Sequence, residues 1–419
     1  MRTKKWIYLI LVFVVTMGFA TPISADVHEC LDAHGALVEA WGTDFTRNYL
    51  GAIELLDKFY VSLPQNRLGE TLYPDYFGGV YINDYGNLVI LVVESHSLAD
   101  ASAFTRSLYE GGGIIKEVEF AYNDLRNAFE FLSDFIPNTP DSLPASNVDG
   151  VMLDIVNNEV LVSLAVYTEE KIDLFVDMVF DAPFLRFHPS PGLPEATFEY
   201  DYSTEIPHYP YEQVTAAMTH TVRPGDSLFL RNQFGNLLHV GSVGYMARMD
   251  WQWQSRMGFV TAAHIGLSGT LRTGDHLYNS SGMVIGIVRE VRHHTVDVAF
   301  VEITNALGSQ SVAFGGLGRN DASNIVGNRV FLDGASGRGR QGTIMTAWGG
   351  WTSSGNWVDG FMVSTTTQRN DSGGLVYSWT SAVNNGMNGI LVAGWEGRES
   401  VFTTVSMHRS FLGGGLRFP

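Results

Sequence analysis

Three short segments in the second half of the chain carry residue types that could perform acyl transfer together. A strand-like run over 258–263 leads directly into His264, Asp297 lies within an apolar run, and Ser372 lies in a tight turn followed by two glycines. A serine hydroxyl is a weak nucleophile near neutral pH, so a neutral imidazole must remove its proton during attack. A carboxylate behind the imidazole fixes its tautomer and stabilises the imidazolium. The three residues therefore predict a nucleophilic triad.

Each of these residues also has an ordinary structural explanation when it is taken alone. A histidine at the end of a strand is more often structural than catalytic, an aspartate inside an apolar run is often a cap or a buried hydrogen-bond acceptor, and Ser-Gly-Gly is a common loop sequence. The order His264, Asp297, Ser372, with separations of 33 and 75 residues, is what favours the catalytic interpretation.

The sequences around these residues resemble those of the chymotrypsin-fold serine proteases, specifically the secreted bacterial branch of alpha-lytic protease and the streptogrisins. Residues 241–245 (Gly-Ser-Val-Gly-Tyr) and 258–264 (Gly-Phe-Val-Thr-Ala-Ala-His) are similar to the strand pair that leads to the catalytic histidine in that branch. Residues 370–374 (Asn-Asp-Ser-Gly-Gly) are similar to the family's Gly-Asp-Ser-Gly-Gly. The resemblance covers about residues 227–415.

This resemblance implies an activity and a role for each residue. We expect a secreted serine endopeptidase that is made as a zymogen and hydrolyses protein or peptide substrates through an acyl-enzyme, with no cofactor and no metal. His264 would act as general base and acid, Asp297 would orient it, and Ser372 would be the nucleophile. The backbone N–H groups of Asn370 and Ser372 would form the oxyanion hole.

Two departures from the family pattern keep a second interpretation open. Asn370 stands where the family has glycine, although asparagine is among the few residues that tolerate a positive φ angle. The serine that hydrogen-bonds the catalytic aspartate in the family falls at Val392 or Ala393. If these changes spoil the oxyanion geometry or the support of Asp297, the chain would be a catalytically impaired trypsin-fold binding protein.

The resemblance also indicates which residues would line the substrate pocket. Thr366 lies six residues before the nucleophile, where trypsin-like enzymes have an aspartate, so we do not expect cleavage after Lys or Arg. Arg369 either overhangs the pocket, which would favour acidic substrate side chains, or points to solvent. Ala393, Gly394 and Trp395 are expected at the pocket wall.

The elements that must position these residues are short β-rich runs separated by glycine and polar turns. They predict a mainly β domain over 226–419, built as two antiparallel β-barrels, with a short helix over 406–412. Expected strands include 237–248 and 343–346. Residues 337–342 match the dinucleotide fingerprint G-x-G-x-x-G, but β-branched residues follow them and no helical pattern does, so we reject nucleotide binding.

The first half of the chain contains an internal repeat. Residues 79–93 align without gaps with residues 150–164 at an offset of 71. Each copy has two apolar runs joined by a turn, which is typical of a hairpin. A helical pattern follows each copy, at 98–109 and at 169–179.

The repeat predicts an α+β domain over 26–188 with two units, about 79–136 and 150–188. The first unit continues with a strand over 114–120 and an amphipathic helix over 121–135. The region is similar to the pro-regions of the same protease branch. The resemblance therefore implies that the catalytic domain has its own pro-region as a partner, which would assist folding and inhibit the site.

Two further segments predict targeting and processing. Residues 1–25 combine a positive start, an apolar stretch and a small-residue cleavage site, which indicates a signal peptide and an extracellular protein that leaves the membrane when the signal is removed. Residues 189–225 contain six prolines, too many for a packed helix or a central strand. This linker is the expected site of proteolytic processing.

Charge and cysteine content limit the partners. The net charge is −18, and residues 26–225 carry 32 acidic against 9 basic side chains. The basic residues after 225 are all arginine and are scattered, so nucleic-acid binding is not expected. The single cysteine excludes an internal disulfide framework, and we expect a disulfide-free monomer held together by packing.

Overall fold

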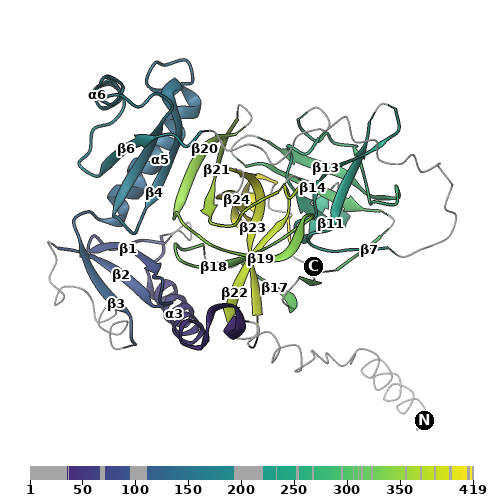
Figure 1. Cartoon of the computed structure of the whole chain (residues 1–419), viewed down its shortest axis with the longest axis horizontal. Coiled ribbons are helices and arrows are strands. Elements are labelled where there is room, and N and C mark those ends of the chain that lie inside the picture. Colours follow the sequence, from purple (N-terminus) through teal and green to yellow (C-terminus); the bar gives the residue numbers. More distant parts are fainter. Residues whose placement is uncertain are drawn as a thin grey trace, which may run out of the picture.

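The computed structural model describes residues 35, 37–66, 71–94, 111–192 and 220–417, except for short gaps at 233, 252–253, 267–268, 294–295, 305, 310, 313–314, 322–323, 354–355, 369, 382–383, 396–398 and 413–415 (Figure 1). The expected signal peptide at 1–25, the expected helix at 98–109, most of the expected linker and Arg369 lie outside the described residues. Among the described residues, no helix is both long and apolar enough to cross a membrane.

The first repeated unit folds as the sequence predicts. Its two apolar runs form an antiparallel hairpin, and a third strand adds in parallel to the second. The parallel third strand follows from the longer connection that precedes it, because a tight turn can join antiparallel neighbours only. The strands are β1 (Phe77–Ile82), β2 (Leu88–Val93) and β3 (Ile114–Val118).

The second unit repeats this arrangement, which confirms the internal repeat. Its hairpin is antiparallel and its last strand is parallel to the second strand of the hairpin. A helix makes the crossover, and Thr168 caps that helix by accepting a hydrogen bond from the Lys171 N–H. The elements are β4 (Val148–Asp154), β5 (Glu159–Leu164), α6 (Glu169–Met178) and β6 (Leu185–Pro189).

Two long helices accompany the repeats. Helix α5 (Tyr122–Asn138) was expected, and it buries Leu125, Phe129, Leu132 and Ile136, which recur at helical spacing on one face. Helix α3 (Thr43–Ser62) was not anticipated, and it contacts β2 and a strand of the second half, β22 (Leu375–Ser381). A short 3₁₀ turn, η1 (Ala145–Asn147), precedes β4.

The second half of the chain is mainly β, as the sequence predicts. Its first part forms an antiparallel sheet with the strand order β10-β11-β14-β13-β12-β8-β9. The strands of this sheet are β8 (Ser227–Arg231), β9 (Leu237–Ser242), β10 (Met246–Trp251), β11 (Gln254–Thr261), β12 (His276–Tyr278), β13 (Val284–Arg292) and β14 (Val298–Ile303).

Its last part forms a second antiparallel arrangement with the order β19-β18-β22-β23-β24-β21-β20. The expected closing helix is α7 (Val405–Phe411). Besides β22, the strands are β18 (Arg329–Gly334), β19 (Gly337–Thr343), β20 (Trp348–Ser353), β21 (Asn356–Val363), β23 (Asn384–Gly394) and β24 (Ser400–Thr404). Shorter strands are β7 (His220–Val222), β15 (Ala306–Gly308), β16 (Ser311–Val312) and β17 (Gly315–Asp321).

Several boundaries differ from the sequence predictions. The expected strand 237–248 is two strands, β9 and β10. The expected strand 343–346 was wrong, because the glycine-rich segment before it pairs with the apolar strand β18 and forms β19 instead. The expected linker is shorter than 189–225, since Pro189 ends β6 and β7 begins at His220.

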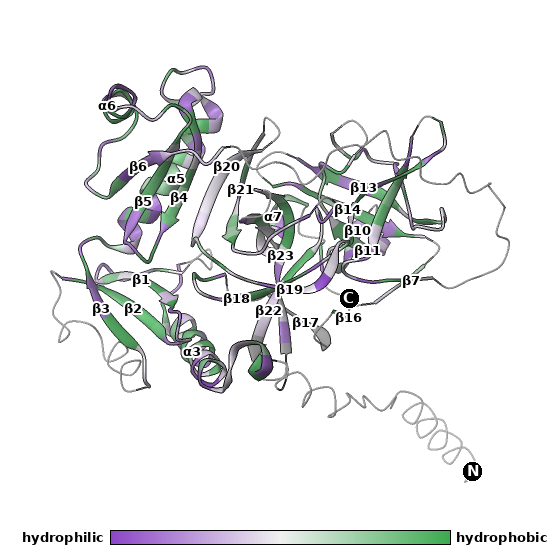
Figure 2. Ribbon diagram, in the orientation of Figure 1, coloured by the Kyte–Doolittle hydropathy of each residue, from purple (hydrophilic) through white to green (hydrophobic). Residues whose placement is uncertain are grey.

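The two halves of the chain share one continuous sheet. Strand β20 pairs with β21 on one side and with β4 on the other, so β4, β5 and β6 extend the sheet of the second half (Figure 1). A glycine of β4 leaves room at this junction: a Cβ atom on Gly150 would lie 2.9 Å from the Trp351 ring and 3.1 Å from the Gly350 carbonyl. Figure 2 shows β4 mostly as hydrophobic, whereas β20 has intermediate hydropathy and is nearly white.

Helix α3 and Trp41, which lies two residues before the helix, form a second contact between the halves. The Trp41 ring stacks on Phe331 of β18 with centroids 5.5 Å apart, and Trp41 Nε1 donates to Gln341 of β19 at 2.9 Å. Tyr49 is fully buried and hydrogen-bonds Asn328. The apolar core therefore runs from α3 into the second half without interruption.

Candidate active site

The three predicted catalytic residues meet where the two sheets of the second half face each other. His264 follows the end of β11, and Asp297 precedes the start of β14. These strands are antiparallel neighbours, with Thr261 opposite Ala299, so the end of one and the start of the other lie at the same edge. Ser372 comes from the loop between β21 and β22 of the other sheet.

A chain of hydrogen bonds joins the three side chains. Ser372 Oγ lies 2.8 Å from His264 Nε2, and His264 Nδ1 hydrogen-bonds Asp297 Oδ2. The other carboxylate oxygen, Oδ1, accepts the backbone N–H groups of Ala263 and His264 at 2.9 Å each. His264 and Asp297 are 3% and 4% exposed and Ser372 is fully buried, so water competes little for these bonds.

Asp297 is held in its charged form. Burial alone would raise the pKa of its carboxyl, but the charge of His264 and the hydrogen bonds from His264, with a smaller effect of His293, lower that pKa overall. His293 Nε2 lies 4.0 Å from Asp297 Oδ1, and His293 Nδ1 contacts Thr270 Oγ1 at 3.0 Å. A charged carboxylate in this position can fix the imidazole tautomer and stabilise an imidazolium.

The two positions at which the resemblance predicts the loss of the supporting serine carry apolar side chains. Val392 and Ala393 are both 2% exposed and carry no hydroxyl group. His293, which the sequence analysis did not select, is the additional polar side chain that lies next to Asp297.

The turn that carries Ser372 has the backbone conformation that its sequence predicts. Asn370 has a φ angle of 68°, so it adopts the left-handed conformation expected for the position where the family has glycine. Gly373 has a φ angle of 87°, and a Cβ atom there would lie 2.2 Å from Thr261 Oγ1. Glycine is required at that position for both reasons.

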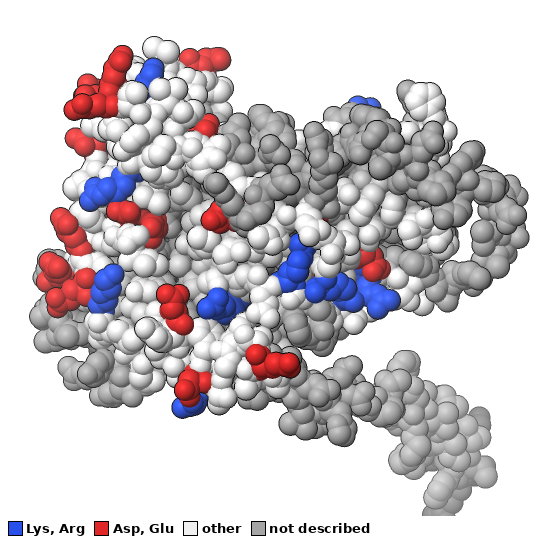
Figure 3. Space-filling model, in the orientation of Figure 1, with Lys and Arg blue, Asp and Glu red and all other residues white. Residues whose placement is uncertain are grey.

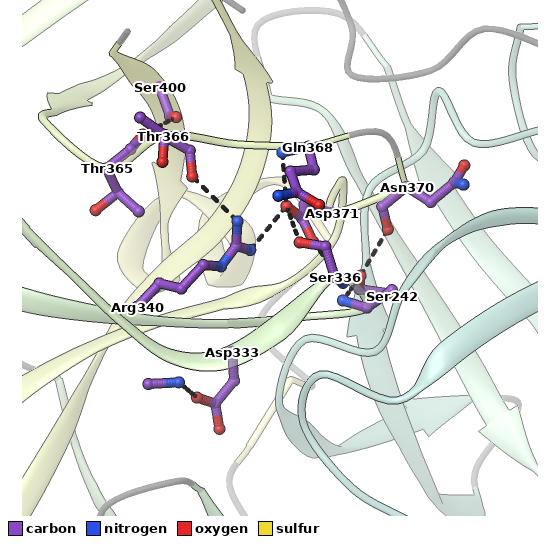
Figure 4. Close-up of polar contacts among 12 residues, drawn as sticks. Ser242, Asp333, Ser336, Arg340, Thr365, Thr366, Gln368, Asn370, Asp371 and Ser400 are labelled. Carbon is purple, nitrogen blue, oxygen red and sulfur yellow. Dashed lines mark hydrogen bonds and ion pairs between the residues drawn. The ribbon is translucent and has the colours of Figure 1, made fainter. Parts of the chain in front are cut away.

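Asp371 anchors this turn from inside (Figure 4). It is fully buried, and its carboxylate accepts hydrogen bonds from the Ser336 N–H at 3.0 Å, from Ser336 Oγ at 2.7 Å and from the Gln368 N–H at 2.8 Å. Arg340 Nη2 lies 2.7 Å from Asp371 Oδ2 and provides the opposite charge. The turn is therefore fixed by β18–β19 residues that are distant in the sequence.

Ser242 ties the turn to the other sheet (Figure 4). Its hydroxyl donates to the Asn370 carbonyl at 2.7 Å and accepts the Ala335 N–H at 2.8 Å. Its backbone N–H donates to the Ser372 carbonyl at 2.8 Å. The last residues of β9 thus hold both sides of the turn.

The expected pocket residues are only partly brought together. The Thr366 side chain is exposed, and its carbonyl accepts a hydrogen bond from Arg340 Nη1 at 3.0 Å. Its neighbour Thr367, which the sequence analysis did not select, is buried next to Gly394: a Cβ atom on Gly394 would lie 2.5 Å from Thr367 Oγ1 and 3.3 Å from Ser400 Oγ. Ala393 is buried in β23.

Trp395 contacts the first half of the chain. Its Nε1 donates to the Gly192 carbonyl at 2.9 Å. Beside this bond lies a cavity of about 530 Å³ between the two halves, whose lining includes His188, Trp351, Met362, Trp395 and Glu399. Within the described ranges, no cluster of three or more His, Cys, Asp or Glu side chains could hold a metal ion.

Sequence comparison identifies the first half. Residues 43–106 match the family described as Pro-like N-terminal domain, and residues 123–190 match the Pro-like C-terminal domain. These ranges include α3, which the repeat did not reveal, and the complete second unit. Comparison with curated protein sequences finds no significant match.

Comparison with solved structures finds proteases that align with slightly less than half of this chain. Thermobifida fusca protease A is 21% identical, with 47% of this chain and 97% of that chain covered, at a TM-score of 0.37. Cellulomonas bogoriensis chymotrypsin is 22% identical, with 48% and 98% covered and a TM-score of 0.36. Nocardiopsis protease (NAPase) is 20% identical, with 47% and 98% covered and a TM-score of 0.36.

The organisation of the chain agrees with the arrangement that the sequence predicts. Two Pro-like domains precede a mainly β region of two facing antiparallel sheets. At the boundary of those sheets lie His264, Asp297 and Ser372, joined by hydrogen bonds. The chain is therefore similar in organisation to a pro-region followed by a chymotrypsin-fold domain.

Proposed function

We propose that the chain is the precursor of a secreted serine endopeptidase, with residues 1–25 as its export signal. The observation that carries this proposal is the hydrogen-bonded series from Ser372 Oγ through His264 to Asp297. The leader sequence supports export, and the pro-region in front of the β domain supports synthesis as a zymogen.

The proposed reaction begins with attack of Ser372 Oγ on the carbonyl carbon of a peptide bond. His264 Nε2 takes the hydroxyl proton, and the carbonyl electron pair moves to oxygen. Backbone N–H groups of Asn370 and Ser372 would stabilise this oxyanion, each contributing about 3 kcal/mol. When the intermediate collapses, His264 returns the proton to the leaving amine, and an acyl-enzyme on Ser372 remains.

Water completes the proposed cycle. His264 removes a proton from the water molecule as it attacks the acyl carbon, and then gives that proton to Ser372 Oγ as the ester bond breaks. The charged Asp297 stabilises the imidazolium in both halves of the reaction. Since Thr366 provides no negative charge where trypsin-like enzymes have one, the proposed substrates are not cleaved after Lys or Arg.

The zymogen proposal has separate structural support. All three catalytic candidates are buried in the uncut chain, and the end of the pro-region hydrogen-bonds Trp395 through Gly192. Cutting between residues 193 and 219 would leave the pro-region attached by strand pairing, by packing and by hydrogen bonds such as that from Trp395 to Gly192.

Labelling with a fluorophosphonate tests the proposed function. The processed protein should form an adduct on Ser372, and Ser372→Ala and His264→Ala should each reduce peptide hydrolysis by about 10⁴-fold or more, because the residues act as a unit. If cleavage is autocatalytic, Ser372→Ala should also accumulate as an uncut precursor on a gel. A folded, processed protein that neither labels nor hydrolyses peptides would instead favour the catalytically impaired binding protein.

A further inference from the structure

His239 contacts the residue that departs from the family at the oxyanion turn. It lies on β9, three residues before Ser242, and its Nδ1 lies 3.2 Å from the side-chain amide nitrogen of Asn370. An amide nitrogen can only donate a hydrogen bond, so Nδ1 must be the acceptor and carry no proton. This contact joins a ring of the first sheet to the turn of the second.

The His239 ring is held in place for this contact. Phe229 lies opposite His239 in the β8–β9 pair, and the two rings stack with centroids 4.9 Å apart and an interplanar angle of 24°. Burial lowers the pKa of His239, and the Gly241 backbone and the charge of Asp371 offset this effect in part. The ring is therefore favoured in the neutral form, which provides the acceptor.

Asn370 is strained unless something holds it. Its φ angle of 68° is unfavourable for a residue with a side chain, and in another backbone conformation its N–H would point elsewhere. Ser242 Oγ holds the carbonyl of Asn370 at 2.7 Å, and His239 holds its side chain. Both contacts come from β9, so one strand supports the backbone and the side chain of the same residue.

We propose that His239 is a positioning residue that keeps Asn370 in the left-handed conformation, so that the Asn370 N–H stays aimed at the oxyanion. This inference rests on the proposed function, since it assumes that the turn stabilises an oxyanion. It explains how Asn370 can stand at a glycine position without loss of the turn. The Asn370 side chain, which glycine lacks, is restrained by the acceptor nitrogen of His239.

A double-mutant cycle tests this role in processed enzyme made from the full chain. His239→Leu removes the acceptor, whereas His239→Asn keeps one close to the Nδ1 position. Each is made with Asn370 and with Asn370→Gly, because glycine adopts a positive φ angle without support. The measurements are kcat and KM on one peptide substrate and the rate of fluorophosphonate labelling.

We expect His239→Leu to lower kcat and the labelling rate about tenfold, because only the fraction of enzyme with Asn370 in the left-handed conformation reacts. KM should change less than about twofold. His239→Asn should restore most of this loss. In the Asn370→Gly background, His239→Leu should have little effect. If His239→Leu does not accumulate in folded form, His239→Gln replaces it, since its acceptor lies farther from Asn370.

Two results would overturn the inference and leave the proposed function intact: equal losses of kcat in both backgrounds, or no loss in either, while the wild type remains active. A wild type that neither hydrolyses peptides nor labels would remove the proposed function, and this inference with it.

Discussion

At the scale of single residues, the reactive turn depends on a buried carboxylate. Asp371 exposes no surface, and its charge is matched by Arg340, whose side chain is 21% exposed. The same guanidinium donates to the Thr366 carbonyl, so it joins the buried anchor to the segment in front of the turn. Removing one partner of such a pair leaves an uncompensated buried charge.

Arg340→Met should therefore destabilise the protein by about 3–5 kcal/mol, because the buried Asp371 carboxylate would lose the opposite charge beside it. Denaturant unfolding of the full chain with Ser372→Ala, which would prevent the proposed self-cleavage, measures the effect. The matched control is Arg417→Met, which breaks an exposed pair with Asp250 and should change stability by less than about 1 kcal/mol. Similar changes in both variants would mean that Arg340 is not needed by Asp371.

At the scale of elements, the β20–β21 hairpin is the part of the second half that meets the pro-region sheet. Gly349 and Gly350 lie beneath the rings of Trp351 and Trp357, and Trp357 Nε1 donates to Asp359 at 2.9 Å. Burial raises the pKa of Asp359 to about 6. A carboxyl with a raised pKa in the folded state favours folding in its protonated form, so its contribution is complete below about pH 3.8 and is lost as the pH rises through about 6.

Asp359→Asn should therefore stabilise the Ser372→Ala precursor at pH 8 by up to about 3 kcal/mol, because the amide has no charge to bury and can still accept from Trp357. At pH 4 the gain should nearly vanish. Thermal unfolding at the two pH values measures the difference, and Asp44→Asn, which changes an exposed carboxylate, is the control. A gain that is the same at both pH values would contradict the assigned titration.

At the scale of the whole molecule, both Pro-like domains contact the second half. The N-terminal one contributes α3, which packs against β22, and Trp41, two residues before α3, stacks on Phe331 of β18. The C-terminal one contributes β4, which pairs with β20. Asp and Glu side chains gather over the pro-region in the face that Figure 3 shows. Surface charges of this kind are screened by salt, so the apolar packing and the strand pairing should dominate the association.

The second half should fail to reach an active state when it is made alone as residues 220–419. Its sheets join distant segments, and such non-local pairing folds slowly because loops must close before the contacts form. Residues 26–219 added as a separate chain should restore activity by offering β4 and α3 as a template. Recovered peptide hydrolysis after refolding is the measurement.

A variant pro-segment provides the control for this rescue. In Gly150→Val, the Cβ atom would lie 2.9 Å from the Trp351 ring and 3.1 Å from the Gly350 carbonyl, so β4 should pair poorly with β20 and the rescue should weaken. Efficient refolding of residues 220–419 without any pro-segment would show that the template is not needed. Equal rescue by both pro-segments would instead exclude the β4–β20 pairing as its basis.

The features that depend on local patterns could be predicted from the sequence. Alternating and helical apolar runs predicted the repeated hairpins, α5 and α6, because these elements are set by which residues can face a core. Motif chemistry singled out His264, Asp297 and Ser372, whose catalytic roles stay a prediction. The tolerance of asparagine for a positive φ angle predicted the conformation of Asn370.

The distant residues that support that motif become evident only in the folded chain. Arg340, Thr367 and His239 have no local sequence signal, because the residues that they contact at the site, Asp371, Gly394 and Asn370, lie at least 27 residues away and are chosen by strand register. The docking of α3 and the β4–β20 pairing could not be predicted from the sequence either, since the edge strands β4 and β20 could each have faced solvent. Contacts between segments remote in sequence depend on how all the elements pack into one core. In this chain, that packing brings the pro-region together with the domain that carries the candidate site.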